Sequence, residues 1–158
     1  MVSYRINEAE FNVPAAWQDQ SLIAFKIPAT NGTKDASFVI TRDFTRKQSR
    51  FAEHIDTQLK MFDKQLPEFR LKKNESFQFQ DHAGVWLEYE WTQGAARLAI
   101  RQVFYDRQDY ALICTLTTLP EDVSAIDPIW RTVMSRMKLL PLADASESAP
   151  SFPPRAMP

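Results

Sequence analysis

Apolar and polar residues alternate along most of the chain, and a period of two predicts β-strands. Pro, Gly and Asn-rich or Asp-rich stretches break the alternation and predict turns. The expected strands cover residues 4–13, 21–28, 37–44, 71–80, 84–91, 96–105 and 110–118. The last four follow one another through short turns, which predicts an antiparallel meander.

Two stretches change to a helical period. Phe51, Ile55, Leu59 and Phe62 recur at helical spacing between Ser49 and Leu66, which predicts an amphipathic helix. A second apolar stripe follows Pro120 and consists of Ile126, Ile129, Trp130, Val133, Met134 and Met137. The expected fold class is therefore α+β: a curved antiparallel β-sheet with two helices packed on one face, which leaves the other face open.

The chain has 158 residues, which is enough for one domain with a proper core. We expect this single domain to cover residues 1–140. Residues 141–158 are rich in Pro, Ser and Ala and show no periodicity, so we expect a disordered tail there.

Charge and composition exclude several classes of protein. A formal net charge of -1 gives no electrostatic footprint for nucleic acid. The single cysteine, Cys114, cannot form an internal disulfide, and this fits a reducing compartment. The N-terminal residues include acidic ones where a signal peptide needs an apolar segment, and no stretch approaches the ~18 apolar residues of a membrane span. We therefore expect a cytoplasmic protein that does not itself insert into a membrane.

No residue pattern of a catalytic or cofactor site is present. His54 and His82 have no ligand-spaced partners, and the three glycines of the chain cannot build a glycine-rich phosphate loop. Glu88 and Glu90 lie two apart on one strand, which is typical of a solvated face. No nucleophile has a base beside it. We expect no enzyme activity, no metal and no cofactor.

Several predicted strands carry one row of small, aliphatic or uncharged polar residues. These rows are Leu22 and Ala24, then Ser37, Val39 and Thr41, then Leu98, Ile100 and Gln102. Gln102 is the unusual member, because a buried amide without a partner costs about 1–3 kcal/mol. Two interpretations remain open. The rows belong to an ordinary core with a few satisfied polar groups, or they form a concave apolar surface that is open to a ligand.

Four short strings of the sequence resemble a known family. AWQDQS, ASFVI, KQLPEF and RQVF resemble the Eag proteins, the effector-associated chaperones of bacterial type VI secretion systems. The resemblance runs from about Tyr4 to Met137. It implies a fold like that of DcrB and of the PsbP/Mog group.

The resemblance also implies a function. Eag proteins are homodimeric cytoplasmic adaptors that bind the N-terminal transmembrane helices of large PAAR-containing effectors, often Rhs toxins, and shield them before loading on the VgrG spike. The groove residues implied here, with Ile100 added from the pattern, are Leu22, Ala24, Ser37, Val39, Thr41, Gln58, Leu66, Leu98, Ile100 and Gln102. A small-ligand or lipid-binding module that uses the same face is the alternative, because a fold alone does not set a function.

Overall fold

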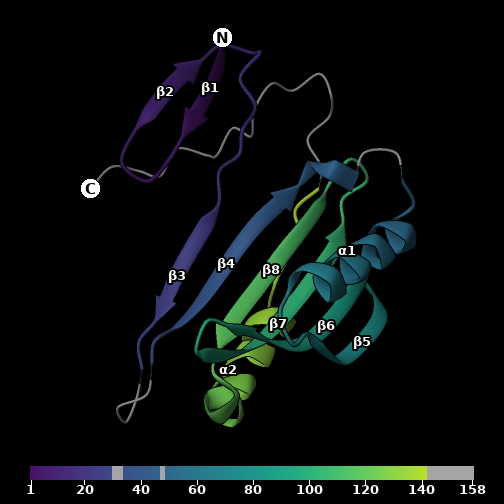
Figure 1. Ribbon diagram of the computed structural model, residues 1–158. Helices are drawn as coiled ribbons and strands as arrows, with labels where there is room; N and C mark the ends of the chain where they lie inside the picture. Colours follow the sequence, from purple (N-terminus) through teal and green to yellow (C-terminus); the bar gives the residue numbers. More distant parts are fainter. Residues whose placement is uncertain (30–33, 47–48, 142–158) are drawn as a thin grey trace. The chain divides into compact units, whose positions relative to one another are not determined.

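The computed structural model describes residues 1–29, 34–46 and 49–141 (Figure 1). The chain divides into two compact units, and Ser21–Lys138 form the larger one. The boundary expected at residue 140 stays a prediction, because residues 142–158 lie outside the described part of the chain.

The smaller unit contains a two-stranded hairpin. Strand β1 (Val2–Arg5) pairs antiparallel with β2 (Glu10–Val13), and the ring of Tyr4 stacks on that of Phe11 at 6.2 Å. The single strand expected over residues 4–13 is therefore wrong. The chain reverses between Ile6 and Ala9, where the Ile6 N–H donates to the Ala9 carbonyl at 2.9 Å. Asn7 in this turn belongs to a residue type that favours reversal.

The larger unit is built on a six-stranded antiparallel sheet with the order β3-β4-β8-β7-β6-β5. Strands β5 to β8 form the expected meander, and the β3-β4 hairpin joins it through the pairing of β4 with β8. The strands are β3 (Ile23–Ile27), β4 (Ala36–Asp43), β5 (Arg70–Phe79), β6 (His82–Gln93), β7 (Ala96–Asp106) and β8 (Ala111–Thr118). Short 3-10 turns, η1 (Phe44–Arg46) and η2 (Pro120–Asp122), follow β4 and β8.

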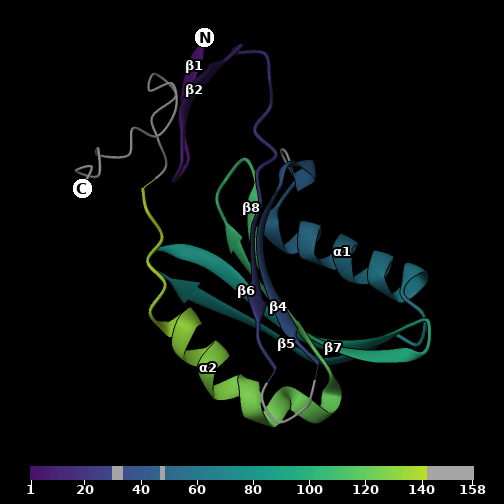
Figure 2. The same cartoon turned by 90° about the vertical axis from the view of Figure 1, so that its left-hand side faces the viewer.

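Helix α1 (Phe51–Gln65) packs on one face of this sheet, and helix α2 (Val123–Ser135) packs on the other (Figure 2). Ile55 of α1 belongs to a core cluster with Leu87 and Phe104. Trp130 of α2 packs edge-on against Phe38 at 5.4 Å and against Trp86 at 6.0 Å. Trp86 and Leu87 are neighbours on β6, and neighbouring residues on a strand point to opposite faces. The two helices therefore cover opposite sides of the sheet.

The α+β class, with an antiparallel sheet and two helices, is confirmed, but the expectation that both helices share one face is wrong. The reason lies in the central strands, which are apolar on both sides. Val103 and Cys114 are fully buried on the α2 side, and Leu87 and Phe104 are fully buried on the α1 side. A sheet with two apolar faces needs a cover on each.

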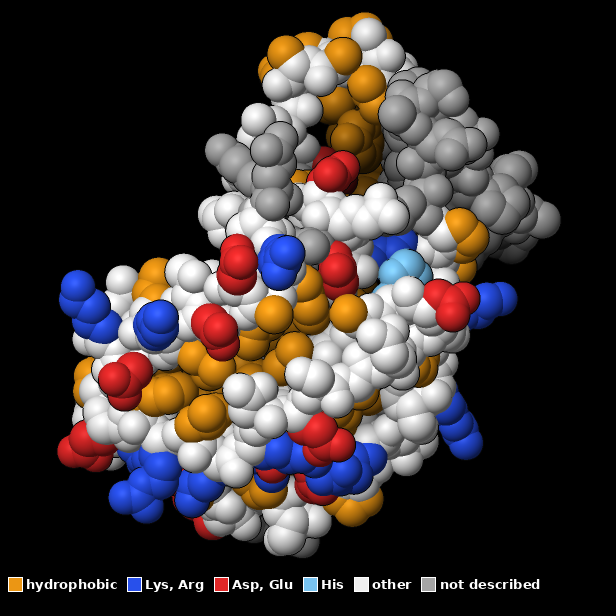
Figure 3. Space-filling view, turned by 90° about the vertical axis from the view of Figure 1, so that its right-hand side faces the viewer, with side chains coloured by type: hydrophobic (Ala, Val, Ile, Leu, Met, Phe, Trp, Pro, Cys, Tyr) orange, Lys and Arg blue, Asp and Glu red, His pale blue; other side chains and the backbone are white. Residues whose placement is uncertain are grey.

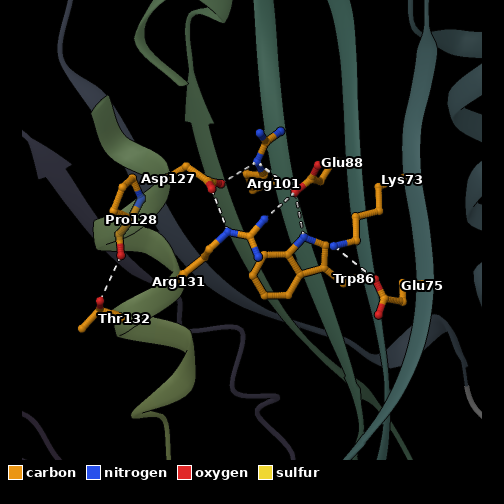
Figure 4. A network of polar contacts seen from close by, with 9 residues as sticks. All are labelled: Lys73, Glu75, Trp86, Glu88, Arg101, Asp127, Pro128, Arg131 and Thr132. Carbon is orange, nitrogen blue, oxygen red and sulfur yellow. Dashed lines mark hydrogen bonds and ion pairs between the residues drawn. The ribbon is translucent and has the colours of Figure 1, made fainter. Parts of the chain in front are cut away.

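A network of ion pairs fastens α2 to the sheet (Figure 4). Arg101 Nε lies 3.3 Å from both Glu88 Oε1 and Asp127 Oδ1, and Arg131 Nε donates to Asp127 Oδ2 at 2.7 Å. Burial opposes ionisation of Asp127, but hydrogen bonds from Arg131 and Arg101 outweigh it and lower its pKa below the ordinary 3.8. The solvated face expected for Glu88 is therefore wrong, since its side chain is only 13% exposed.

Candidate binding surface

Helix α1 covers only part of the face on which it lies. Its apolar side chains pack over β6 and β7, where Leu59 and Phe62 contact the cluster that contains Tyr89 and Ile100. In Figure 1 neither of the described α-helices lies over β3 and β4 on this side. The residues left there are called the uncovered strand face, and they are Ala24 on β3, Ser37, Val39 and Thr41 on β4, and Thr115 and Thr117 on β8.

Strand register brings these residues together. Thr117 pairs with Ser37 on one side and Ile100 on the other. Thr115 likewise lies between Val39 and Gln102. Because Ile100 belongs to the cluster under α1, the whole row points to the α1 side of the sheet.

The uncovered strand face consists of small aliphatic and hydroxyl side chains, all of them uncharged. All but the exposed Ala24 are partly buried. A charged residue on each side marks its rim: Lys26 pairs with Asp35 at 3.6 Å, and Asp43 Oδ2 lies 3.3 Å from His54 Nε2. The surface can therefore contact an apolar partner and still offer hydrogen bonds without desolvating a charge.

Gln102 is the polar member of the neighbouring row, and its amide has partners inside the fold. The Tyr89 hydroxyl donates to Gln102 Oε1 at 3.0 Å, and Gln102 Nε2 donates to Thr115 Oγ1 at 3.1 Å. Burial raises the pKa of Tyr89 far above its ordinary value of 10.0, so its hydroxyl stays a donor. An amide has two donors and two acceptor positions. One N–H and one lone pair of the fixed amide therefore lie outside these two hydrogen bonds.

Gln58 borders the uncovered strand face from α1. It lies one helical turn after His54, whose ring reaches Asp43 of β4, and residues at i and i+4 share one side of a helix. This flank of α1 therefore turns toward β4. Gln58 is partly buried there.

The structure brings together most of the expected groove residues. Ala24, Ser37, Val39 and Thr41 lie on the uncovered strand face, with Gln102 beside it. Leu22 precedes β3 and is 59% exposed.

Three expected groove residues lie in or against the core cluster on the α1 side instead. Leu66 and Leu98 are partly buried against the core cluster, and Ile100 is part of it at 4% exposure. Ile100 therefore supports the fold and offers almost no surface to a ligand. Ile100 and Gln102 lie on the same side of β7. Ile100 is covered by α1, and Gln102 borders the uncovered strand face through Thr115.

Thr115 and Thr117 are the residues that sequence reasoning missed. They alternate with Leu116 in the string LICTLTT, so one side of this strand carries hydroxyls and the other is apolar. That signal gains its meaning only once β8 is known to lie between β4 and β7.

Two clefts also lie on the described part of the structure. A polar cleft of about 460 Å³ is lined by Glu68, Phe69, Arg70, Glu90 and Arg97. A second cleft, of about 390 Å³, lies between the end of α2 and the α2 side of β5 and β6. Neither contains an expected groove residue. Within the part of the chain that the structure describes, no group of three or more His, Cys, Asp or Glu is arranged to hold a metal ion.

Burial raises the pKa of Cys114 to about 12, so the thiol stays protonated and unreactive. None of the described helices is long and apolar enough to cross a bilayer.

Comparison with known proteins identifies the family. The DcrB family profile matches residues 8–136. The chain belongs to the DcrB family. It is also 42% identical over 137 residues to Effector EagT6 of Pseudomonas aeruginosa strain PAO1, an alignment that covers 87% of this chain and 95% of that protein. The resemblance to Eag proteins is thereby confirmed.

A crystal structure agrees with the fold of this DcrB-family protein. A Pseudomonas aeruginosa protein of unknown function, PA94, has a crystal structure that superposes with a TM-score of 0.83 and 41% identity, over 90% of this chain and 99% of that one. A weaker likeness, with a TM-score of 0.47 and 15% identity, is to the solution structure of PsbP (CyanoP) from Synechocystis sp. PCC 6803, over 84% of this chain and 88% of that one.

Proposed function

We propose that this DcrB-family protein is a cytoplasmic adaptor of type VI secretion, without enzyme activity. It binds and shields the N-terminal transmembrane helices of a PAAR-containing effector, often a Rhs toxin, before the effector is loaded on the VgrG spike. The name of its relative, Effector EagT6, supports a link to such effectors. The uncovered strand face is the observation that carries the rest of the proposal.

The chemistry of that face suits a transmembrane helix. Helices that pack closely in membranes are rich in Gly, Ala and Ser, so they present backbone and hydroxyl groups together with apolar surface. Val39 and the threonine methyl groups cover apolar surface, while Ser37, Thr41, Gln58 and Gln102 offer neutral hydrogen-bonding groups. A charge in their place would have to be desolvated at a larger cost.

The apolar area that docking would remove from water determines only the gross hydrophobic gain. If docking removes on the order of 1,000 Å² of apolar area from water, the gross gain is about 25 kcal/mol. Ordering and association offset most of this gain. The area alone therefore fixes no affinity, and the proposed binding requires no nucleotide.

The alternative function, a small-ligand or lipid module on the same face, has less support. Both clefts described above are lined by residues away from the uncovered strand face. A row of strand residues that lies outside both of these clefts fits a long partner better than a small one.

The test is co-purification with an effector's N-terminal transmembrane region. The full chain and a tagged N-terminal segment of a PAAR effector, chosen from beside the adaptor's gene, are expressed together. Val39→Asp should abolish capture, because it places a charge where the helix docks. Val133→Asp makes the same change on α2, where Val133 is 42% exposed, and should leave capture unchanged.

A second variant separates hydrogen bonding from apolar contact. Gln102→Ala should weaken capture without abolishing it, since the apolar residues remain. Circular dichroism and thermal melting establish that each variant is folded. If folded Val39→Asp and Gln102→Ala both retain the effector segment as well as the unchanged chain does, this function is wrong.

A further inference from the structure

The cleft between the end of α2 and the sheet has no part in the proposed function. We call it the α2 cleft. Its volume is about 390 Å³, and sites for small molecules typically measure about 300–1,000 Å³. Such sites combine apolar and aromatic walls with a few polar groups that fix the orientation of the ligand. The α2 cleft has both.

The walls of the α2 cleft are mainly aromatic. The rings come from Phe77 and Phe79 on β5, Trp86 on β6 and Tyr105 on β7. The centroid of the Tyr105 ring lies 5.9 Å from that of Phe77 and 5.7 Å from that of Phe79, so these three rings pack together. The thioether of Met134 on α2 lines the cleft as well, and such a side chain adapts to the shape of a neighbouring ring. Walls of this kind bind a flat aromatic group through stacked and edge-to-face contacts.

An irregularity in β5 turns its side chains toward this cleft. Leu71 pairs with Tyr89, and Lys73 pairs with Glu88. The register with β6 therefore shifts by one residue between Leu71 and Lys73. Without the shift, Lys73 would share the α1 side with Leu71, because residues two apart on a regular strand point the same way. The shift places Lys73 and every second residue after it, as far as Phe79, on the α2 side. Bulges are frequent beside functional sites, where they re-aim a side chain.

Two cations lie beside the aromatic walls. Lys73 Nζ lies 5.6 Å and the guanidinium carbon of Arg131 lies 5.5 Å from the centroid of the Trp86 ring (Figure 4). Both side chains line the cleft, and so does Glu75, which pairs with Lys73 at 3.1 Å. The charged lining therefore carries one positive charge in excess, and this favours an anion.

Arg131 has hydrogen-bond donors that an anion can use. Its Nε donates to Asp127 at 2.7 Å, and Glu88 lies 3.8 Å from Nη2, beyond hydrogen-bond distance. A guanidinium has five N–H groups, and no other residue in the described part of the chain accepts a hydrogen bond from Arg131. The side chain is 53% exposed, so an entering anion can reach it.

The surface around β5, the outer wall of the cleft, is mixed. Strand β5 is the last strand of the sheet. Figure 3 views the side of the molecule to which β5 and α1 belong, and charged side chains of both signs surround the apolar ones there. Such a surface suits a ligand that has a charged end and an apolar body.

We propose that the α2 cleft binds a small aromatic carboxylate. The aromatic body lies against Phe77, Phe79 and Trp86. The carboxylate accepts hydrogen bonds from Lys73 and Arg131 at the mouth of the cleft. A hydrogen bond between ionised partners is stronger than a neutral one, so the carboxylate sets the orientation of the ring. This site lies on the opposite side of the sheet from the uncovered strand face, and it goes beyond the proposed function.

Nuclear magnetic resonance of the isotope-labelled full chain tests this binding, with naphthalene-1-carboxylate as the probe. Trp86 lines the cleft, whereas Trp91 packs against the core cluster on the α1 side. The probe should therefore shift the indole N–H signal of Trp86 and leave that of Trp91 unchanged, with a Kd of about 1 mM or below. Naphthalene-1-carboxamide has the same rings without the charge and should bind at least about threefold more weakly. Absence of the Trp86 shift, or equal affinity for the two probes, would overturn the proposal.

Two lysine variants test the charge at the site. Lys73→Met removes a cation of the cleft and should raise the Kd of naphthalene-1-carboxylate at least about threefold. Lys72→Met makes the same change in net charge at the neighbouring residue, which pairs with Glu90 at 3.6 Å, and should leave the Kd unchanged. Equal effects of the two variants would show that the probe senses only the overall charge of the protein, and this overturns the proposal.

Two serine variants test the position of the site. Ser135→Trp places an indole in the mouth of the cleft and should abolish binding of the probe. Ser124→Trp makes the same exchange near the start of α2 and should leave binding unchanged. Both serines are exposed, so the fold accommodates the larger side chain, and circular dichroism verifies this. A folded Ser135→Trp variant that binds the probe as tightly as the unchanged chain does would overturn the proposal.

Failure here is distinct from failure of the proposed function, because the probe is measured without an effector. Ser135→Trp should retain capture of the effector segment, and Val39→Asp should retain the probe. Loss of capture in folded Ser135→Trp would indicate that the effector occupies the α2 cleft, which overturns the proposal. Loss of the probe in folded Val39→Asp would place the probe on the uncovered strand face and would overturn it as well.

Discussion

Gln102 and Thr115 face each other across β7 and β8, and the amide Nε2 of Gln102 donates to Oγ1 of Thr115 at 3.1 Å. With the Tyr89 hydroxyl on its other side, this amide is held in one orientation. A glutamine in an otherwise apolar row thus has partners inside the fold, and it still reaches the edge of the uncovered strand face. Its orientation is fixed before any ligand arrives.

Gln102→Leu should lower the free energy of unfolding by about 1–3 kcal/mol, because the buried Tyr89 hydroxyl loses its acceptor. The double variant Gln102→Leu with Tyr89→Phe should regain at least half of that loss, since the orphaned hydroxyl is gone. Urea denaturation of the three variants measures both effects. Equal stability of Gln102→Leu and the unchanged chain would show that Tyr89 finds another acceptor.

Arg101 and Arg131 should differ in their contribution to stability. Arg101 is 14% exposed and lies between Glu88 and Asp127. Arg101→Met therefore removes a positive charge that balances these two mostly buried carboxylates. A loss of about 3–5 kcal/mol is expected. Arg131 is 53% exposed, and Arg131→Met should cost less than about 1 kcal/mol. Denaturation of the two variants compares them, and similar losses would contradict this account of the network.

The same network predicts a dependence on acidic pH. The pKa of Asp127 is lowered in the folded chain from its ordinary 3.8. Its contribution to stability is therefore complete above about pH 4 and is lost as the pH falls through the folded value. Asp127→Asn should be less stable at neutral pH and should lose less stability on acidification. Parallel acid curves for Asp127→Asn and the unchanged chain would count against this assignment.

Gly84 allows the ring of Phe77 to lie directly over the backbone of β6. A methyl group at Gly84 would come within 2.7 Å of Phe77 Cε2, and the ring also packs edge-on against Tyr105 at 5.9 Å. Gly84→Ala should therefore cost about 1–3 kcal/mol. Phe77→Leu in the same chain should relieve part of this loss. Thermal melting of the single and double variants measures these losses of stability. If the losses from Gly84→Ala and Phe77→Leu simply add in the double variant, the contact is contradicted.

Burial of Cys114 predicts a loss of stability at alkaline pH. Its pKa is raised from the ordinary 9.0 to about 12, so its contribution is complete below pH 9 and is lost as the pH rises toward 12. Each pH unit above the pKa of the unfolded thiol lowers the free energy of unfolding by about 1.4 kcal/mol. When the pH rises from about 8 to about 10, the free energy of unfolding of the unchanged chain should fall by about 1.4 kcal/mol more than that of Cys114→Ala. Burial also raises the pKa of Tyr89, and this contribution is the same in both chains. The pKa of Tyr105 is raised by burial and, to a smaller extent, by Cys114, so Cys114→Ala also reduces the alkaline loss that comes from Tyr105.

Sequence patterns predicted the elements well, because local periodicity determines them. The helix expected between Ser49 and Leu66 is α1, and the four-strand meander is β5 to β8. The early hairpin escaped notice, because two short strands and a turn around Asn7 imitate one alternating strand of ten residues. Propensity alone does not separate these cases.

Long-range arrangement was harder to predict. The position of β8 between β4 and β7 depends on pairing between distant segments, and it decides that Thr115 and Thr117 join Ser37 and Val39. The side taken by α2 was missed for a similar reason. Trp130 belongs to the apolar stripe expected for the second helix, and its contact with Trp86 of β6 becomes visible only in three dimensions.

One side of β8 packs in the core, and the other side belongs to the uncovered strand face. Cys114 and Leu116 are buried on one side, while Thr115 and Thr117 point the other way and remain partly accessible. Evolution can therefore exchange the hydroxyl residues to suit a different cargo while the buried pair preserves the architecture. Diversity among homologues should concentrate at alternate positions of this strand.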